Sequence, residues 1–304
     1  MDITGVICLI ILFIFGAILG SFACCTAWRM RLKETKKQNP GRWSVCLSCG
    51  KRLQRSEKIP ILSWVIQRGK CKHCGASIGK AELLSELTLG IIFVALGAFF
   101  YPELTRAVSS SDTSSILLLI FSIILMIIIV TIMWILVVYD AKWQKLPVSL
   151  LTILNACAII YTILHFVGLI LISTGTLSHT SSSFFNILSY TNPWTAVLST
   201  LGAVAILAGT YFCLYFFSKE KLVGSGDWLI ALPIALILGN WWLALLALFL
   251  SNLLGSIYGI ALKVRSACSK KTPVRQIPFG PFLIIAFVIV FVAQNWLINL
   301  IASI

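Results

Sequence analysis

The chain has 304 residues, of which 59% are hydrophobic and only 11% are charged, and its mean hydropathy is +0.98. Apolar content this high would leave large exposed patches on a globule in water, so the composition excludes a soluble globular domain. The formal net charge of +14 suggests an anionic partner, either a lipid surface or a nucleic acid. We therefore expect an all-α polytopic membrane protein.

Long apolar runs follow one another along the chain, most of them near the roughly 20 residues that a helix needs to span a bilayer. They lie at about 3–27, 84–101, 116–138, 148–172, 195–217, 228–262 and 280–303. The run 228–262 has 35 residues, too many for one ordinary span, and Gly239 with Asn240 offers a turn near its middle. We interpret this run as a tight hairpin, which predicts about eight transmembrane helices. The first half of the hairpin, about 12 residues, would rise only about 18 Å.

The basic residues predict the orientation of these spans. The segment from Arg29 to Lys80 holds 14 of the 24 Lys and Arg residues, so by the positive-inside rule it is cytoplasmic and the N-terminus faces outward. Eight spans then leave Arg106 as the basic residue of the outer loops, whereas a single span at 228–262 would place the basic segment 263–275 outside. The first span has Asp2 in place of a basic n-region, so we expect a retained anchor rather than a signal peptide.

Three parts are expected on this basis: a first transmembrane helix at 1–28, a small cytoplasmic domain at 29–80 and a membrane-embedded domain at 81–304. The Ser/Thr-rich outer segment that contains His179 is expected to be a solvated connector. The positive charge is concentrated beside the membrane, where attraction to anionic headgroups explains it at about 1 kcal/mol per residue. No nucleic-acid-binding motif accompanies it, so we expect anionic lipid and no nucleic acid as the partner.

Two C-x-x-C pairs lie in the predicted cytoplasmic domain, Cys46 with Cys49 and Cys71 with Cys74, separated by 21 residues. This spacing is typical of a zinc ribbon, in which two knuckles place four thiolates around one ion. A segment with so little apolar content cannot form a core, so metal binding would supply its folding free energy. Disulfides are not expected in a reducing cytosol, and a redox-active pair of dithiols is the alternative. We interpret the other six cysteines as apolar packing residues.

Two of the ten carboxylates stand at the same predicted depth. Asp140, in YDAKWQKLP, closes the third span, and Asp227, in GSGDWLIA, opens the sixth, both at the cytoplasmic edge. Ionisable groups at a membrane boundary are functional candidates. If these two approach within a few ångströms they cannot both ionise, so one keeps a proton and the other can take one from water. Such a pair, which titrates as a unit, provides an acid and a base for peptide-bond hydrolysis.

Two glycines, Gly224 and Gly226, precede Asp227. Because they lack a β-carbon, they would allow left-handed backbone angles and let a substrate strand pass close to Asp227. The alternative is that GSGD only begins a helix, with Asp227 accepting backbone N–H bonds as a cap. The matching depth of Asp140 favours the catalytic interpretation.

These motifs resemble those of the type IV prepilin leader peptidases, membrane aspartic proteases of the GxGD class. In that family the Asp before a short stretch ending in Pro and the Asp of GxGD form the catalytic pair, which implies Asp140 and Asp227 here. GAILGSF at 16–22 is similar to the family's first-helix signature, and residues 42–75 resemble its cytoplasmic domain. ELLSELTLG at 82–90 resembles the start of its second helix, and IPFGPFLIIA at 277–286 resembles the entry to its last helix.

The resemblance implies a substrate with a short basic leader joined to a hydrophobic helix. Such a type IV prepilin or type II secretion pseudopilin is cut after a Gly at the cytoplasmic face of the bacterial inner membrane. Many members with the four-cysteine domain also N-methylate the new N-terminus from S-adenosylmethionine. No recognisable cofactor loop occurs in this chain, so methylation is implied by the resemblance alone. Two departures, the absence of a Lys shortly after GSGD and of an Asn after GSF, could alter substrate fit or methylation.

Two glutamates, Glu82 and Glu86, lie one helical turn apart near the cytoplasmic end of the second span. Ion pairing with the basic segment is the simplest interpretation. Contact with an amine of the substrate is the alternative.

Two other functions remain open. A presenilin-like intramembrane protease also uses Tyr-Asp and GxGD, but it would lack the four cysteines, and no Pro-Ala-Leu occurs near the C-terminus. A proton-coupled transporter could use Asp140 and Asp227 as relay groups. It would need further acidic or polar groups deeper in the spans, and the sequence offers few.

Overall fold

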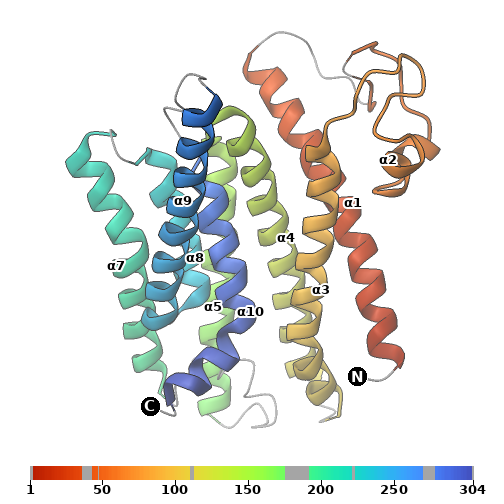
Figure 1. The fold of residues 1–304 in the computed structure, drawn as a ribbon. Helices are drawn as coiled ribbons and strands as arrows, with labels where there is room; N and C mark the ends of the chain where they lie inside the picture. The colour runs from red at the N-terminus through yellow and green to blue at the C-terminus, as the bar shows by residue number, and fades with distance from the viewer. Residues whose placement is uncertain are drawn as a thin grey trace. The chain divides into compact units, whose positions relative to one another are not determined.

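The computed structural model describes residues 3–35, 43–46, 48–109, 113–174, 192–220, 223–269 and 278–302 (Figure 1). The predicted connector around His179 lies outside these ranges. The long helices are α1 (Ile3–Glu34), α3 (Lys80–Ser109), α4 (Thr113–Trp143), α5 (Val148–Ser173), α7 (Pro193–Ser218), α9 (Trp241–Ser269) and α10 (Gly280–Ala302). The short ones are η1 (Ser56–Lys58), α2 (Leu62–Ile66) and α8 (Ser225–Leu238).

Seven helices of the described part of the chain are long and apolar enough to cross a membrane, and α8 is a shorter eighth. The all-α polytopic fold is therefore confirmed, and the protein is a multi-pass membrane protein. The hairpin within 228–262 is confirmed as well, because α8 ends at Leu238 and α9 begins at Trp241. Gly239 adopts a φ of 59°, which glycine tolerates without strain. Asn240 Oδ1 then accepts the N–H of Trp242 at 2.8 Å and caps α9.

Several helices run past the apolar segments that predicted them. α1 continues to Glu34, and α4 continues through Asp140 to Trp143. Apolar composition marks only the part of a helix that needs a lipid environment, whereas backbone hydrogen bonding continues beyond it. Asp140 therefore belongs to the last turn of α4, where its direction is set by a regular helix.

The chain divides into two compact units, 1–99 and 100–304. The division falls within α3 and does not coincide with the predicted boundaries at 28 and 80. The predicted assignment of a separate cytoplasmic domain at 29–80 stays a prediction. Each unit is described by itself below.

In the first unit, α1 and α3 pack so closely that only glycine fits at the contact. A β-carbon on Gly16 would lie 2.8 Å from the carbonyl oxygen of Leu89, and one on Gly20 would lie 2.7 Å from that of Ser85. The Ser85 hydroxyl donates to the carbonyl of Gly20 at 3.0 Å. The GAILGSF motif is thus a small-residue helix interface of the kind that drives association of membrane helices.

In the second unit, α8 packs against α5, α7, α9 and α10, and α10 also packs against α4 (Figure 1). The start of α10 therefore contacts both the helix that carries Asp140 and the helix that carries Asp227. This arrangement brings together segments more than 130 residues apart.

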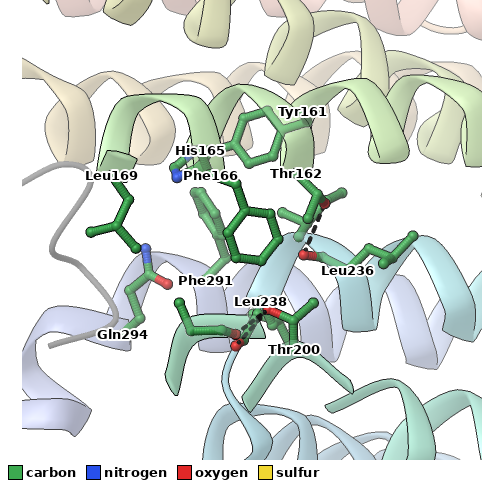
Figure 2. A pocket seen from close by; sticks show the side chains of 13 residues that line it. Tyr161, Thr162, His165, Phe166, Leu169, Thr200, Leu236, Leu238, Phe291 and Gln294 are labelled. Atoms are coloured by element: carbon green, nitrogen blue, oxygen red, sulfur yellow. Dashed lines mark hydrogen bonds between the residues drawn. The ribbon is translucent and has the colours of Figure 1, made fainter. Parts of the chain in front are cut away.

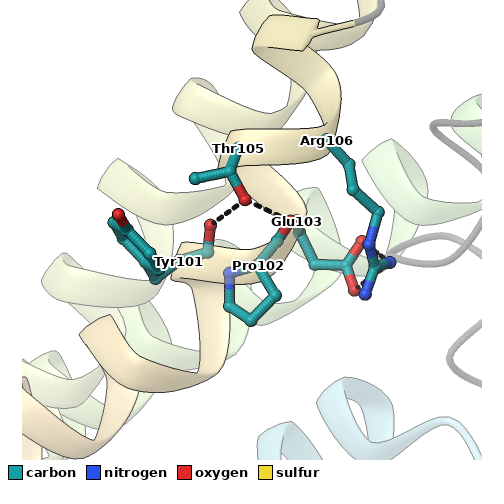
Figure 3. A network of polar contacts seen from close by, with 5 residues as sticks. All are labelled: Tyr101, Pro102, Glu103, Thr105 and Arg106. Carbon is teal, nitrogen blue, oxygen red and sulfur yellow. Dashed lines mark hydrogen bonds and ion pairs between the residues drawn. The ribbon is translucent and has the colours of Figure 1, made fainter. Parts of the chain in front are cut away.

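The end of α3 in the second unit carries an ion pair. One guanidinium nitrogen of Arg106 contacts both carboxylate oxygens of Glu103, at 2.9 and 3.0 Å (Figure 3). Thr105 donates to the carbonyls of Tyr101 and Pro102 at 3.1 and 2.9 Å. Glu103 is buried and Arg106 is exposed. Arg106 is the basic residue expected in the outer loops, and its charge is neutralised by Glu103 of the same helix. This pairing strengthens the predicted excess of positive charge on the cytoplasmic side.

Candidate functional site

Asp140 is buried in the last turn of α4. After Trp143 the helix ends at Gln144, whose φ of 51° turns the chain towards Pro147 and α5. The side chain of Asp140 is 5% exposed. Its Oδ2 accepts the backbone N–H of Gly280 at 3.2 Å, so the first amide of α10 holds the carboxyl group, as helix N-termini hold anions.

Asp227 lies in the first turn of α8 and is half-buried. Gly224 precedes the helix, and its N–H donates to Asp227 Oδ2 at 3.2 Å. The Asp227 N–H donates to the carbonyl of Gly224 at 3.2 Å. The capping role considered for GSGD is therefore present, and it orients the carboxylate.

The start of α10 lies against both the segment that carries Asp140 and the helix that carries Asp227. Gly280 makes both contacts: a β-carbon there would be 2.9 Å from Asp140 Oδ2 and 3.4 Å from Cδ1 of Ile230 in α8. Sequence analysis did not single out Gly280 as a site residue. Its only signal was the glycine in the PFGPF segment at the predicted start of the last helix.

The two glycines before Asp227 do not use the left-handed conformation that glycine allows. Gly224 is extended, with a φ of −77°, and Gly226 already belongs to the first turn of α8. Close passage of a substrate strand beside these glycines stays a prediction. Gly226 is needed for packing, because a β-carbon would lie 2.9 Å from Cβ of Leu146. The segment after Asp140 is thereby packed directly on GSGD, and the two motifs form one structure.

The backbone of α8 is completed by a side chain from α5. Pro233 has no N–H, so within α8 the carbonyl of Leu229 loses its usual donor four residues on. Asn155 Nδ2 donates to this carbonyl at 3.0 Å and to that of Leu151 at 2.8 Å. In an apolar medium an unsatisfied carbonyl costs several kcal/mol, so Asn155 allows a proline in the helix that carries Asp227.

The far end of α8 borders a cavity between α5, α7, α8 and α10 (Figure 2). Thr162 donates to the carbonyl of Leu236 at 3.1 Å, and Thr200 donates to that of Gly239 at 3.3 Å. The last carbonyls of a helix have no partner within it, so these hydroxyl groups let α8 end inside the protein. His165 and Gln294 also line the cavity, with the ring of His165 4.5 Å from that of Tyr161.

A polar network joins α7 and α9. Ser251 Oγ donates to the carbonyl of Leu248 at 2.9 Å, so it accepts the hydroxyl proton of Tyr211 at 3.2 Å. Asn252 Nδ2 donates to the same Tyr211 oxygen at 3.2 Å. Phe279, next to Gly280, packs against Tyr211 with the two rings tilted and their centroids 5.4 Å apart. Sequence analysis missed this network, because single polar residues in long apolar helices carry no local signal.

The four predicted metal ligands form one cluster in the first unit. The sulfurs of Cys46, Cys49, Cys71 and Cys74 all lie within 4.8 Å of one another, and those of Cys46 and Cys74 are 3.9 Å apart. Four sulfurs at about 2.3 Å from a tetrahedral zinc ion would be about 3.8 Å apart. The cluster therefore fits a metal ion, and its four thiols would hold one as a structural site with no open position.

The two C-x-x-C pairs have the same backbone fold. The N–H of Gly50 donates to the carbonyl of Cys46 at 2.9 Å, and the N–H of Gly75 donates to that of Cys71 at the same distance. Both glycines have positive φ, 69° and 71°, which turns the chain back after each second cysteine. The equivalence indicates two knuckles that face one another.

Backbone amides and neighbouring thiols act differently on the cysteines of this cluster. The N–H groups of Cys49 and Ser48 lower the pKa of Cys46 to about 6. The N–H of Ala76 lowers the pKa of Cys74, but desolvation and the adjacent thiols outweigh it and raise that pKa to about 11. The thiols thus compete for protons, which a cation in their midst would relieve.

Of the two glutamates expected near the cytoplasmic end of the second span, Glu86 is buried and Glu82 is half-buried. Glu86 Oε2 accepts the backbone N–H of Ile61 at 2.6 Å, which joins α3 to the four-cysteine segment. Both glutamates belong to the first unit, whereas the two aspartates belong to the second. A contact of Glu82 or Glu86 with substrate stays a prediction.

Comparison with known proteins matches residues 14–100 to the bacterial peptidase A24 N-terminal domain. The prepilin leader peptidase/N-methyltransferase of Dichelobacter nodosus is 23% identical, over 90% of this chain and 87% of its own length. The protein of the same name from Bacillus subtilis (strain 168) is 28% identical, over 89% and 88%. The one from Stutzerimonas stutzeri is 28% identical, over 80% and 69%. No solved structure matches the chain.

The chain is similar to the prepilin leader peptidases over most of its length. The family match covers most of the first unit, including GAILGSF and the four cysteines, and the full-length relatives extend the similarity over the second unit. The presenilin-like alternative finds no support in these relatives.

The cysteine cluster predicts a metal content that can be measured. We expect about one zinc per chain in protein purified without chelator, and loss of most of it in Cys46→Ser or Cys71→Ser, because each removes one of four ligands. Cys213→Ser, on the exposed side of α7, is the matched control and should keep the metal. Full-length protein with four reduced thiols and no bound metal would contradict the prediction.

The bond from Asn155 to Leu229 predicts a coupling between Asn155 and Pro233. Asn155→Leu should destabilise the protein by about 1–3 kcal/mol, because it leaves a buried carbonyl unsatisfied. Pro233→Ala restores the N–H that bonds to Leu229, so in that background Asn155→Leu should cost much less. Unfolding in mixed micelles measures both effects, with Asn295→Leu at an exposed position of α10 as control. Equal costs of Asn155→Leu in the two backgrounds would refute this account.

Proposed function

We propose that this protein is a membrane aspartic endopeptidase that removes the short basic leader of type IV prepilins or pseudopilins at the cytoplasmic face of the bacterial inner membrane. The observation that carries the proposal is the position of Gly280 at the start of α10, where it donates to Asp140 Oδ2 and lies against Ile230, three residues after Asp227 in α8. These carboxylates come from different helices, and each accepts an N–H at the start of a helix. The names of the homologues support the substrate class.

The chemistry follows from two carboxyl groups that share one proton. A water molecule between them gives a proton to the ionised carboxylate as its oxygen bonds to the carbonyl carbon of the scissile peptide. The protonated carboxyl group donates to the carbonyl oxygen. The carbon–nitrogen bond then breaks while the leaving amine takes a proton from the pair. The amides of Gly224 and Gly280 would keep both carboxyl groups aimed at the water throughout.

The proposed site suits the predicted topology. Asp140 is in the last turn of α4 and Asp227 in the first turn of α8, ends that the positive-inside rule assigns to the cytoplasm. A prepilin with a hydrophobic helix in the bilayer would present its leader junction at this level. A transporter is favoured less, because Glu103, the other buried carboxylate among the described residues of 100–304, is paired with Arg106.

Methyl transfer from S-adenosylmethionine stays a prediction of the resemblance. The printed names of the relatives include N-methyltransferase. The cavity of Figure 2 has no carboxylate among its lining residues that could hold the ammonium or ribose groups of that cofactor. It does not fit the cofactor, and no methyl-transfer step is assigned to the described residues.

Replacing either aspartate tests the proposal directly. Asp140→Asn or Asp227→Asn should abolish cleavage of a prepilin, a fall of several orders of magnitude, because neither amide can exchange a proton with water. Purified variant and prepilin in detergent or liposomes, followed by the mass of the product, give the measurement. Glu220→Gln, an exposed carboxylate seven residues before Asp227, is the matched control and should cleave normally. Processing by either Asn variant at the normal rate would overturn the proposal.

The contact of Gly280 with Asp140 predicts a second sensitive position. Gly280→Ala should lower cleavage by about tenfold to a hundredfold, because its methyl group would displace the carboxyl group by an amount comparable with the shifts that impair catalysis. Gly209→Ala in α7 is the control, since the nearest atom to a β-carbon there is 3.7 Å away. Normal cleavage by Gly280→Ala would show that the Gly280 amide does not position Asp140.

A further inference from the structure

The short helix α2 exposes apolar side chains although it lies in the polar, basic part of the first unit. Ile59, Leu62, Val65 and Ile66 are 46%, 51%, 56% and 70% exposed. Leu62, Val65 and Ile66 are three or four residues apart and lie on one side of α2, and Ile59 precedes the turn that leads into this helix. We call this set the α2 face. A patch of this kind beside charged residues marks a surface that contacts a partner or a membrane.

The depth of the α2 face is set by one hydrogen bond. Glu86 lies almost two turns inside α3 and accepts the N–H of Ile61 at 2.6 Å. Gly20 of α1 lies at the same level, because a β-carbon on Gly20 would be 2.7 Å from the carbonyl oxygen of Ser85 and 2.8 Å from Cα of Glu86. The chain that leads into α2 is therefore held beside the two transmembrane helices of its unit rather than beyond their ends (Figure 1).

The side chains of α1 and α3 at this level are apolar and exposed. Phe22 of α1 is 52% exposed and Leu84 of α3 is 60% exposed, and both helices qualify as membrane spans. Exposed apolar side chains on membrane helices are the ones that lipid covers. The α2 face therefore continues a lipid-facing surface at the edge of the bilayer, where amphipathic helices lie.

The turn before α2 is strained in a way that serves this placement. Ile61 has φ 63° and ψ −55°, and the N–H of Leu62 donates to the carbonyl of Pro60 across it. This is the rare kind of γ-turn, which is unfavourable for a β-branched residue. The bonds that hold it are the Glu86 carboxylate and the Val65 N–H to the Ile61 carbonyl at 3.0 Å. A strained turn persists only where the surroundings stabilise it, and it is often functional.

The charges around the α2 face select the partner. Arg55, Lys58, Arg68 and Lys70 flank it in the chain and are exposed. Such a combination of an apolar face with cationic neighbours is complementary to anionic headgroups. A prepilin leader, which is basic by the proposed function, would be repelled by the same charges. The bilayer is therefore the occupant that both the apolar and the charged residues fit.

We propose that the α2 face is a membrane-binding surface that inserts among anionic lipids at the inner leaflet, with Glu86 holding it at that depth. The four-cysteine cluster would then be fixed against the membrane, because Gly69, three residues after Ile66, packs on Trp64 of α2 and leads directly into Cys71. The surface does not depend on the reaction at Asp140 and Asp227.

Photocrosslinking of the full chain in nanodiscs tests the proposal. A benzophenone amino acid at position 66, in discs of phosphatidylethanolamine with phosphatidylglycerol, should give an adduct heavier than the protein by the mass of one lipid. The same group in place of exposed Lys72, in the second knuckle, is the control and should give little lipid adduct. Crosslinking of position 66 only to other parts of this chain, or no adduct at all, would overturn the proposal.

Two further experiments distinguish insertion of the α2 face into the membrane from chance proximity to lipid. In discs of phosphatidylcholine alone the lipid adduct at position 66 should fall several-fold, because the cationic residues lose their counterparts. Val65→Glu with Ile66→Glu should lower lipid crosslinking from a benzophenone at position 62 to a similar extent. Retained zinc content would show that the four-cysteine segment is folded in this variant. An unchanged adduct yield in both arms would mean that the α2 face does not bind the membrane as proposed.

Discussion

A carboxylate at the edge of an apolar medium must be held by hydrogen bonds, and the membrane-embedded unit is built around this requirement. Asp140 and Asp227 each accept one backbone N–H, from Gly280 and from Gly224 respectively. Both donors lie where a helix begins, so the unpaired amides of helix N-termini become partners for the acids. Because the donors belong to the backbone, the carboxyl groups are oriented by the fold itself.

The same requirement explains why α8 can be short and interrupted. A helix of 14 residues that contains Pro233 leaves several carbonyls without intrahelical donors. Asn155 and Thr162 from α5, and Thr200 from α7, donate to these carbonyls. Neighbouring helices thus supply what water would supply elsewhere. The helix that carries Asp227 is held along its length by side chains of its neighbours, which favours a rigid position for the proposed catalytic group.

Glycines provide the close contacts on which both units depend, although for a different reason from the one that their motifs suggest. Gly226 admits Leu146, Gly280 admits the carboxyl group of Asp140, and Gly20 admits the backbone of α3. In each case a β-carbon would collide with an atom from a distant segment. The glycines of the GxGD, FGPF and GSF motifs are therefore contact points between segments. The conformational freedom of glycine is used instead at turns, at Gly239, Gly50 and Gly75.

The amino-acid sequence by itself determined the spans, the hairpin at Gly239 and the cysteine cluster, because hydropathy, charge asymmetry and ligand spacing are local properties of a chain. It also predicts that two aspartate motifs lie at the same depth. Only the tertiary structure decided that Gly280 holds Asp140, that Asn155 replaces the donor missing at Pro233, and that Glu86 bonds to Ile61. These contacts join residues at least 25 positions apart. A single polar residue or glycine within a long apolar helix has many potential partners, and only the packing of the helices selects one.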